Sequence, residues 1–212
     1  MIRLLPALCL LSSVLCSLAR ASEPAGLGSD LGYLRIHSLV QERGALAAAL
    51  LKGSPLVLDL RYPVDERDAG EILRLELGSP AVTSRLYVLV SPATPVPVVG
   101  AIASSPARPL TLGVKGSRPE PQVAVLQTAA DDRLAYDALA TGTPLADLIS
   151  GRIEKERYDE ASLVQEFKNG NFDARPPETG PARSGDSPAR LTDRVLQRAA
   201  HLHRALQALR RG

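Results

Sequence analysis

Short apolar runs alternate with segments of helical periodicity along most of this chain. The clearest run, residues 56–60, has turn residues on both sides, which is typical of a strand buried on both faces. Residues 40–51 carry apolar side chains at helical spacing and stop before Gly53, as an amphipathic helix does. Strands that alternate with helices predict an α/β domain with a mostly parallel sheet. The expected strands are 32–36, 56–60, 85–90, 109–114 and 122–126, and the expected helices are 40–51, 65–77, 131–140, 144–149, 159–168 and 191–211.

An aspartate interrupts the most apolar of these runs. Asp59 lies inside residues 56–60, and a buried carboxylate is costly unless a cation or hydrogen-bond donors compensate it. Arg35 and Arg61 are the candidate partners, and we expect Asp59 and Arg61 to form a structural polar pair. Both residues end the strand, where a functional loop would begin.

The first 21 residues have the pattern of a secretory signal peptide. A positive residue precedes an apolar run at 4–18, and a small-x-small cleavage site follows at 19–21. The apolar run is too short to span a bilayer comfortably. Cys9 and Cys16 both lie in this segment, so the mature chain is predicted to have no disulfide and no Cys metal site. We therefore expect export to the periplasm or the extracellular space.

Composition and charge argue against several classes of function. The chain carries 25 Lys and Arg against 23 Asp and Glu, with no basic block, which argues against a nucleic-acid partner. We expect no metal site, because His201 and His203 are two positions apart and point to different faces of a helix. Asp131 and Asp132 have the place of helix N-terminal acids. We expect no cofactor, since no phosphate-binding glycine loop is present, and no membrane span after signal cleavage.

The C-terminal part of the chain divides into a linker and a helix. Residues 173–190 are rich in Pro, Gly, Ser and charge, which is typical of a flexible linker. Residues 191–212 predict an amphipathic helix that Thr192 or Asp193 can cap. Its apolar seam must be covered, either by its own core or by a partner. The seam consists of Val195, Ala199, Leu202, Leu206 and Leu209. The expected divisions are the signal peptide 1–21, the α/β domain 22–172, the linker 173–190 and the helix 191–212.

Residues 31–115 resemble the core of the tail-specific, or carboxy-terminal-processing, serine peptidases. The family has a Gly-Tyr-Leu-Arg-Ile strand, then a helix, then a Leu-Asp-Leu-Arg strand, and the same order stands here at 32–36 and 57–61. The resemblance implies a crotonase/Clp-protease-like stack of βαβ units with C-terminal helices. It also implies a tail-specific peptidase-like domain at 22–172.

The positions that carry catalysis in that family differ here. The family's nucleophile follows the third strand, and the residue at that position is Ala93 or Val96, depending on the alignment. Neither residue has the oxygen that a serine-type mechanism needs. The family's glycine loop, which stabilises the oxyanion, corresponds to Tyr62, Pro63 and Val64, and a proline has no N–H to donate. The resemblance therefore implies a degenerate nucleophile and a degenerate oxyanion loop.

Three functions remain open at this point. The first is an exported, catalytically inactive domain that binds or organises other proteins in the cell envelope. The second is an active serine-type endopeptidase with a displaced nucleophile, Ser91, and with Lys115 near the place of the family's base. The third is a structural envelope protein. The candidate partners are a peptide or a protein, including an active relative or a second copy bound through helix 191–212.

Overall fold

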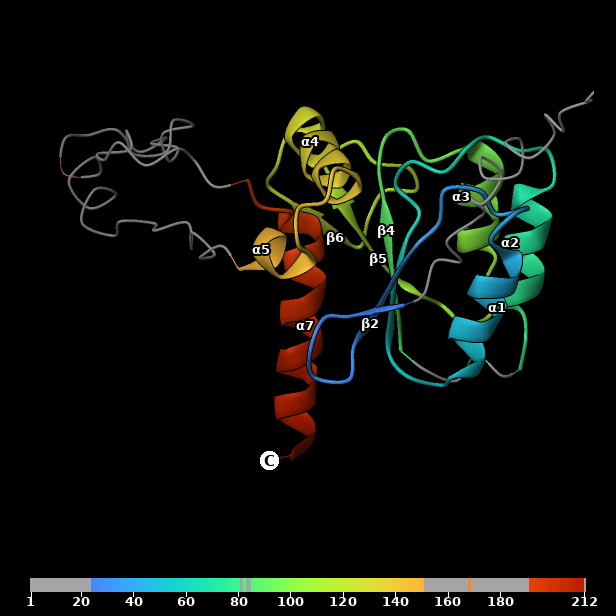
Figure 1. Cartoon of the computed structure of the whole chain (residues 1–212), viewed down its shortest axis with the longest axis horizontal. Helices are drawn as coiled ribbons and strands as arrows, with labels where there is room; N and C mark the ends of the chain where they lie inside the picture. Colours follow the sequence, from blue (N-terminus) through green and yellow to red (C-terminus); the bar gives the residue numbers. More distant parts are fainter. Residues whose placement is uncertain (1–23, 81, 83–84, 151–167, 169–190, 212) are drawn as a thin grey trace, which may run out of the picture.

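A six-stranded sheet forms the middle of the domain in the computed structural model, which describes residues 24–80, 82, 85–150, 168 and 191–211 (Figure 1). Strands β2 to β6 are parallel and lie in sequence order, and β1 pairs antiparallel with β2 at one edge. The mostly parallel α/β architecture predicted from the sequence is therefore confirmed. The strands are β1 (Ala25–Gly26), β2 (Gly32–Arg35), β3 (Leu56–Asp59), β4 (Leu86–Val90), β5 (Leu110–Val114) and β6 (Val123–Val125).

Three helices that connect successive strands cover one face of the sheet (Figure 1). They are α1 (Arg43–Leu51), α2 (Ala69–Leu77) and α3 (Val96–Ala103). Alternate strand residues such as Leu58 and Val88 belong to the apolar core on this side, since side chains alternate between the faces of a strand. Nearly all core residues of this layer are Leu, Ile, Val and Ala, so the face is held by apolar burial.

The opposite face is covered by α7 (Arg194–Arg211), next to α4 (Ala129–Ala140) and α5 (Leu145–Ile149) (Figure 1). The apolar side of α7 packs against the strand residues that point away from α1 to α3. From the sequence, this helix has two possible docking surfaces, its own core or a partner. In the structure it docks on its own sheet. The buried contact includes Val195, Leu196, Ala199 and Ala200 on the helix and Val57, Tyr87, Leu89, Leu112 and Val114 on the strands.

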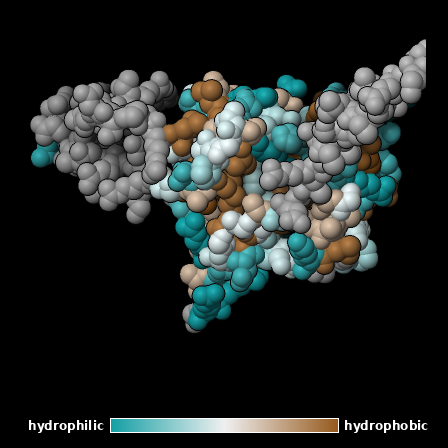
Figure 2. All heavy atoms as spheres, in the orientation of Figure 1, coloured by the Kyte–Doolittle hydropathy of each residue, from teal (hydrophilic) through white to brown (hydrophobic). Residues whose placement is uncertain are grey.

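The last turns of α7 extend beyond the sheet, and their visible surface is mostly hydrophilic (Figures 1 and 2). Val195 and Ala199 of the predicted seam are buried, whereas Leu202 and Leu206 are half-buried and Leu209 is 78% exposed. The seam is therefore covered by the chain itself over its first half and left open at its end.

Helices α1, α2, α5 and α7 begin one to four residues later than predicted, whereas α4 begins two residues earlier and α3 was not among the predicted helices. Helix α1 starts at Arg43 because the carboxylate of Glu42 accepts hydrogen bonds from the main-chain N–H groups of His37 and Ser38, which holds the preceding residues in a turn. Helix α3 has Pro97 in its first turn, where proline is tolerated because an N–H at that position would have no partner within the helix. Helices α2 and α3 approach closely at Gly70, where an added Cβ would lie 2.7 Å from the carbonyl oxygen of Pro97.

Several predicted segments lie outside the described residues. They are the signal peptide 1–21, the linker 173–190 and all of the helix 159–168 except Lys168. In the part of the chain that is described, no helix is both long and apolar enough to cross a bilayer.

Candidate functional site

The candidate site is a buried ionic network centred on Arg61, just beyond the carboxyl end of β3. Asp59 and Arg61 are two positions apart, so both side chains point to the face of the sheet that α7 covers. Both side chains are fully buried. This end of a parallel sheet is where ligands bind in open α/β folds, which makes its polar residues the first to examine for function.

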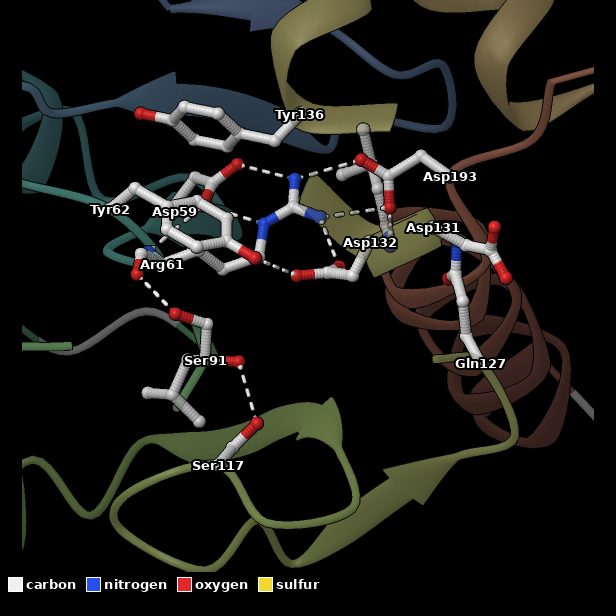
Figure 3. A network of polar contacts seen from close by, with 12 residues as sticks. Asp59, Arg61, Tyr62, Ser91, Ser117, Gln127, Asp131, Asp132, Tyr136 and Asp193 are labelled. Atoms are coloured by element: carbon white, nitrogen blue, oxygen red, sulfur yellow. Dashed lines mark hydrogen bonds and ion pairs between the residues drawn. The ribbon is translucent and has the colours of Figure 1, made fainter. Parts of the chain in front are cut away.

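Three carboxylates surround the guanidinium of Arg61 (Figure 3). Asp59 accepts hydrogen bonds from Nε at 3.0 Å and from Nη2 at 2.7 Å. Asp132, in the first turn of α4, accepts one from Nη1 at 2.7 Å. Asp193, directly before α7, accepts one from Nη2 at 2.8 Å and one from Nη1 at 3.2 Å. The network thus joins α4 and α7 to the carboxyl end of β3.

The predicted pair of Asp59 and Arg61 is present, but the sequence pattern did not reveal the other two members. Asp132 was expected only as a helix N-terminal acid, and Asp193 only as a cap. Asp193 does cap α7, since its Oδ1 accepts a hydrogen bond from the N–H of Leu196, and it binds Arg61 as well. No local pattern distinguishes a capping aspartate that also faces a buried cation from one that faces water. The clue available from sequence was Arg61 itself, two residues beyond a carboxylate in a buried strand.

Phenol groups and a second arginine surround the network. The hydroxyl of Tyr33 donates to Asp59 Oδ2 at 2.8 Å, and the hydroxyl of Tyr62 lies 2.8 Å from Asp132 Oδ2. Arg35 donates to the carbonyl oxygen of Tyr136 at 2.7 Å, and its Cζ lies 3.8 Å from the centre of the same tyrosine ring. The aromatic rings and the arginine exclude water from the carboxylates, which strengthens each charged hydrogen bond.

The ionisation of the network follows from burial and from the opposing charges. Burial alone would raise the pKa of Asp59, but the charges of Arg61 and Arg35 outweigh it, so this pKa lies below its usual value. Burial would lower the pKa of Arg61, but Asp193, Asp59 and Asp132 hold it well above its usual value. For Asp132, burial dominates and raises the pKa despite the nearby guanidinium. Burial and Asp59 raise the pKa of Tyr136 to about 12.

Ser91, the candidate displaced nucleophile, is fully buried at the end of β4. Its hydroxyl donates a hydrogen bond to the main-chain carbonyl of Arg61 and accepts one from the N–H of Ala93 at 3.1 Å. Lys115, the candidate base, is exposed, and no hydrogen bond or ion pair joins it to Ser91 among the described residues. The hydroxyl of Ser91 therefore connects the loops after β3 and β4.

The residues at the family's nucleophile and oxyanion positions lie on the loops beyond β3 and β4. Ala93 and Val96 are both exposed, and Val96 begins α3. Pro63 is buried, and the N–H of Val64 donates to the carbonyl of His37 at 2.7 Å. This N–H is occupied by the protein's own main chain and does not point toward a site for a substrate oxygen.

No group of three or more His, Cys, Asp or Glu side chains within the described ranges is arranged to hold a metal ion. The three aspartates of the network instead direct their oxygens at Arg61 and at phenol and main-chain donors.

No protein-family model, curated protein or solved structure matches this chain significantly. The chemistry of the site therefore has to be inferred from its geometry, which is that of a closed ionic contact between secondary-structure elements.

Proposed function

We propose that this protein is an exported, catalytically inactive domain that binds or organises other proteins in the cell envelope, with a crotonase-like fold related to tail-specific peptidases. One observation carries the proposal. Ser91, the candidate displaced nucleophile at the end of β4, is buried and donates a hydrogen bond to the carbonyl of Arg61. A serine nucleophile instead needs an exposed oxygen and a base within hydrogen-bond reach.

The order of the sheet supports the crotonase-like part of the proposal. Strands β2, β3, β4 and β5 follow one another in space as they do in sequence, and each connecting helix lies on the same face. Successive right-handed βαβ units stacked side by side have this arrangement. The C-terminal helices then cover the other face, as the resemblance implies.

Exposed apolar side chains near the carboxyl ends of the strands support a binding role. Val64 is 59% exposed on the loop after β3, and Val96 is 74% exposed after β4. Ala93 is also exposed, on the loop between β4 and α3, and Val96 is the first residue of α3. These loops stand where open α/β sheets bind their ligands, and apolar side chains are suited to an apolar peptide or protein segment. We therefore assign the partner to a peptide or protein rather than to a charged small molecule.

Labelling with an active-site probe separates this function from the active-peptidase alternative. We expect that a fluorophosphonate probe does not label the purified mature protein, and that Ser91→Ala and Lys115→Met leave this result unchanged. Labelling of the native protein that Ser91→Ala abolishes would establish the serine endopeptidase instead.

Export is tested separately. Mass spectrometry of the exported protein should find Ser22 as its first residue, and an intact Met1 in the cytoplasm would contradict export.

Peptide binding separates a binding domain from a purely structural envelope protein. We expect a displayed peptide library to yield apolar ligands, and we expect the double substitution Val64→Ser with Val96→Ser to weaken their binding by about tenfold or more. Leu75→Ser on α2 is the matched control, because Leu75 is also exposed but lies away from these loops. A library that yields no ligand would favour the structural protein.

A further inference from the structure

The buried network contains more negative than positive charge. Asp59, Asp132 and Asp193 provide three carboxylates, and all three bind Arg61; the only other guanidinium that the described residues place near them is that of Arg35, on the side of Asp59. All five side chains are buried or nearly so. An uncompensated buried charge is unfavourable, and a carboxylate in that situation takes up a proton instead.

The hydrogen bonds show which carboxylates cannot hold that proton. Asp193 faces three N–H donors, two from Arg61 and one from the main chain of Leu196, and none of them can accept a proton. Asp59 faces three N–H groups of Arg61 and the hydroxyl of Tyr33, which already accepts a hydrogen bond from Arg35 Nε at 3.3 Å. A proton on Asp193 would point at an N–H group, which cannot accept it. A proton on Asp59 would have to be accepted by the hydroxyl of Tyr33 and would displace Arg35 Nε from it.

Asp132 is the carboxylate with a suitable acceptor. Its Oδ1 accepts from Arg61 Nη1, but its Oδ2 lies 2.8 Å from the hydroxyl of Tyr62, and a hydroxyl accepts as readily as it donates. Tyr62 is half-buried, and its hydroxyl can rotate about the C–O bond so that it accepts from Asp132. A protonated Asp132 thus keeps both of its hydrogen bonds.

We propose that Asp132 carries a proton which it shares with Tyr62, and that this proton makes the network a pH-dependent latch between α4 and the end of β3. Loss of the proton leaves the excess charge buried and weakens the docking of α4. Three charged or titratable groups face Asp132 directly: Arg61 and Tyr62 beyond β3, and Asp193 before α7. Those next to them are Asp59 at the end of β3, Arg35 and Tyr33 on β2, and Arg133 and Tyr136 on α4, whereas the neighbouring Asp131 binds Thr128. Burial also raises the pKa of Asp132, although the charge of Arg61 beside it acts in the opposite direction.

The direction of the pH effect follows from linkage. A carboxyl group with a raised pKa in the folded protein contributes stability that is complete below its unfolded pKa of about 4 and is lost as the pH rises through the folded pKa. Asp59 behaves in the opposite way, since its pKa is lowered and its contribution is lost as the pH falls below about 4. The latch is therefore strongest in mildly acidic solution.

Carboxyl carbon NMR of the full chain tests the proposal directly. We expect one aspartate to titrate above the usual value of about 4, and we expect Asp132→Asn to remove its signal. A raised pKa that belongs to Asp59 or Asp193, or titration of Asp132 at or below about 4, would overturn the proposal. This measurement on the unsubstituted protein decides the question even if a variant fails to fold.

Thermal unfolding across pH provides the second test. An asparagine side chain in place of Asp132 can accept from Arg61 and donate to Tyr62, so Asp132→Asn imitates the protonated state. We subtract the melting temperature of the unsubstituted protein from that of Asp132→Asn. This difference should increase by at least about 2 °C when the pH is raised from about 4 to about 8. Asp137→Asn is the matched control, because Asp137 lies on the same helix in an exposed ion pair with Arg133, and its profile should stay parallel to that of the unsubstituted protein. Equal pH profiles for Asp132→Asn and the unsubstituted protein would contradict the latch.

Discussion

The two faces of the sheet are built in different ways. On one face, α1, α2 and α3 each follow the strand that they pack beside, and the contact between the layers is almost wholly apolar. On the other face, the cover comes from helices that follow the last strand, and a buried ionic network accompanies the apolar contact. The first face can form from neighbouring segments, whereas the second requires distant parts of the chain to meet.

The difference shows how one buried cation can organise a whole face. Arg61 contacts Asp132, 71 positions away, and Asp193, 132 positions away. Contacts at such separations carry a large entropic cost before they contribute stability. Buried charges are also intolerant of partial pairing, so α4 and α7 must dock in one register for the network to form at all. Apolar packing alone, as on the first face, imposes a weaker demand on register.

The largest effect is expected from Arg61→Leu. The substitution leaves three buried carboxylates without their shared cation, so the free energy of unfolding should fall by about 3–5 kcal/mol or more. Denaturant unfolding followed by circular dichroism measures this change. Arg43→Leu is the control, because Arg43 forms an exposed ion pair with Glu76, and its removal should cost less than about 1 kcal/mol. Similar losses for the two variants would mean that the network does not determine stability.

A smaller effect is expected from Leu196→Ala on the buried side of α7. Leu196 is fully buried in the second face, and a truncation of this kind costs about 2–4 kcal/mol. Leu209→Ala, on the end of the same helix that extends beyond the sheet, should change stability by less than about 0.5 kcal/mol. Chemical denaturation of both variants compares them. An equally small effect of Leu196→Ala would show that α7 detaches in solution, and the second face would then depend on a partner.

The smallest of the three effects is expected on the first face, from Gly70→Ala. A Cβ at Gly70 would lie 2.7 Å from the carbonyl oxygen of Pro97, so α2 and α3 must separate slightly, at a cost of about 1–3 kcal/mol. Gly44→Ala on α1 is the matched control, since its Cβ would meet nothing within 4 Å and alanine favours the helix by up to about 1 kcal/mol. Thermal melting of the pair should shift in opposite directions. A stable Gly70→Ala variant would show that the first face tolerates separation of its helices.

Local signals in the amino-acid sequence were enough to predict most of the strands and helices. Apolar runs and helical spacing are such signals, so all five expected strands and most of the expected helices appear within a few residues of their predicted positions. The pairing of Asp59 with Arg61 was also predictable, because a charge inside a buried strand must find a partner nearby. Helix α3 was not predicted, because its first turn contains Pro97 and follows a proline-rich loop, which weakens the local signal for a helix.

The second face depends on tertiary contacts that no local signal reports. Asp132 and Asp193 look like ordinary acids at helix N-termini, because the spacing along one helix says nothing about a cation on a strand far away in the sequence. The seam of α7 fits its own sheet or a partner equally well as a pattern, and only the docked helix shows which surface covers it. The role of the Ser91 hydroxyl was hidden for the same reason, since its acceptor, the carbonyl of Arg61, comes close only once the parallel strands are paired. Periodicity records which side of an element is buried, whereas the identity of what buries it depends on how the whole chain folds back on itself.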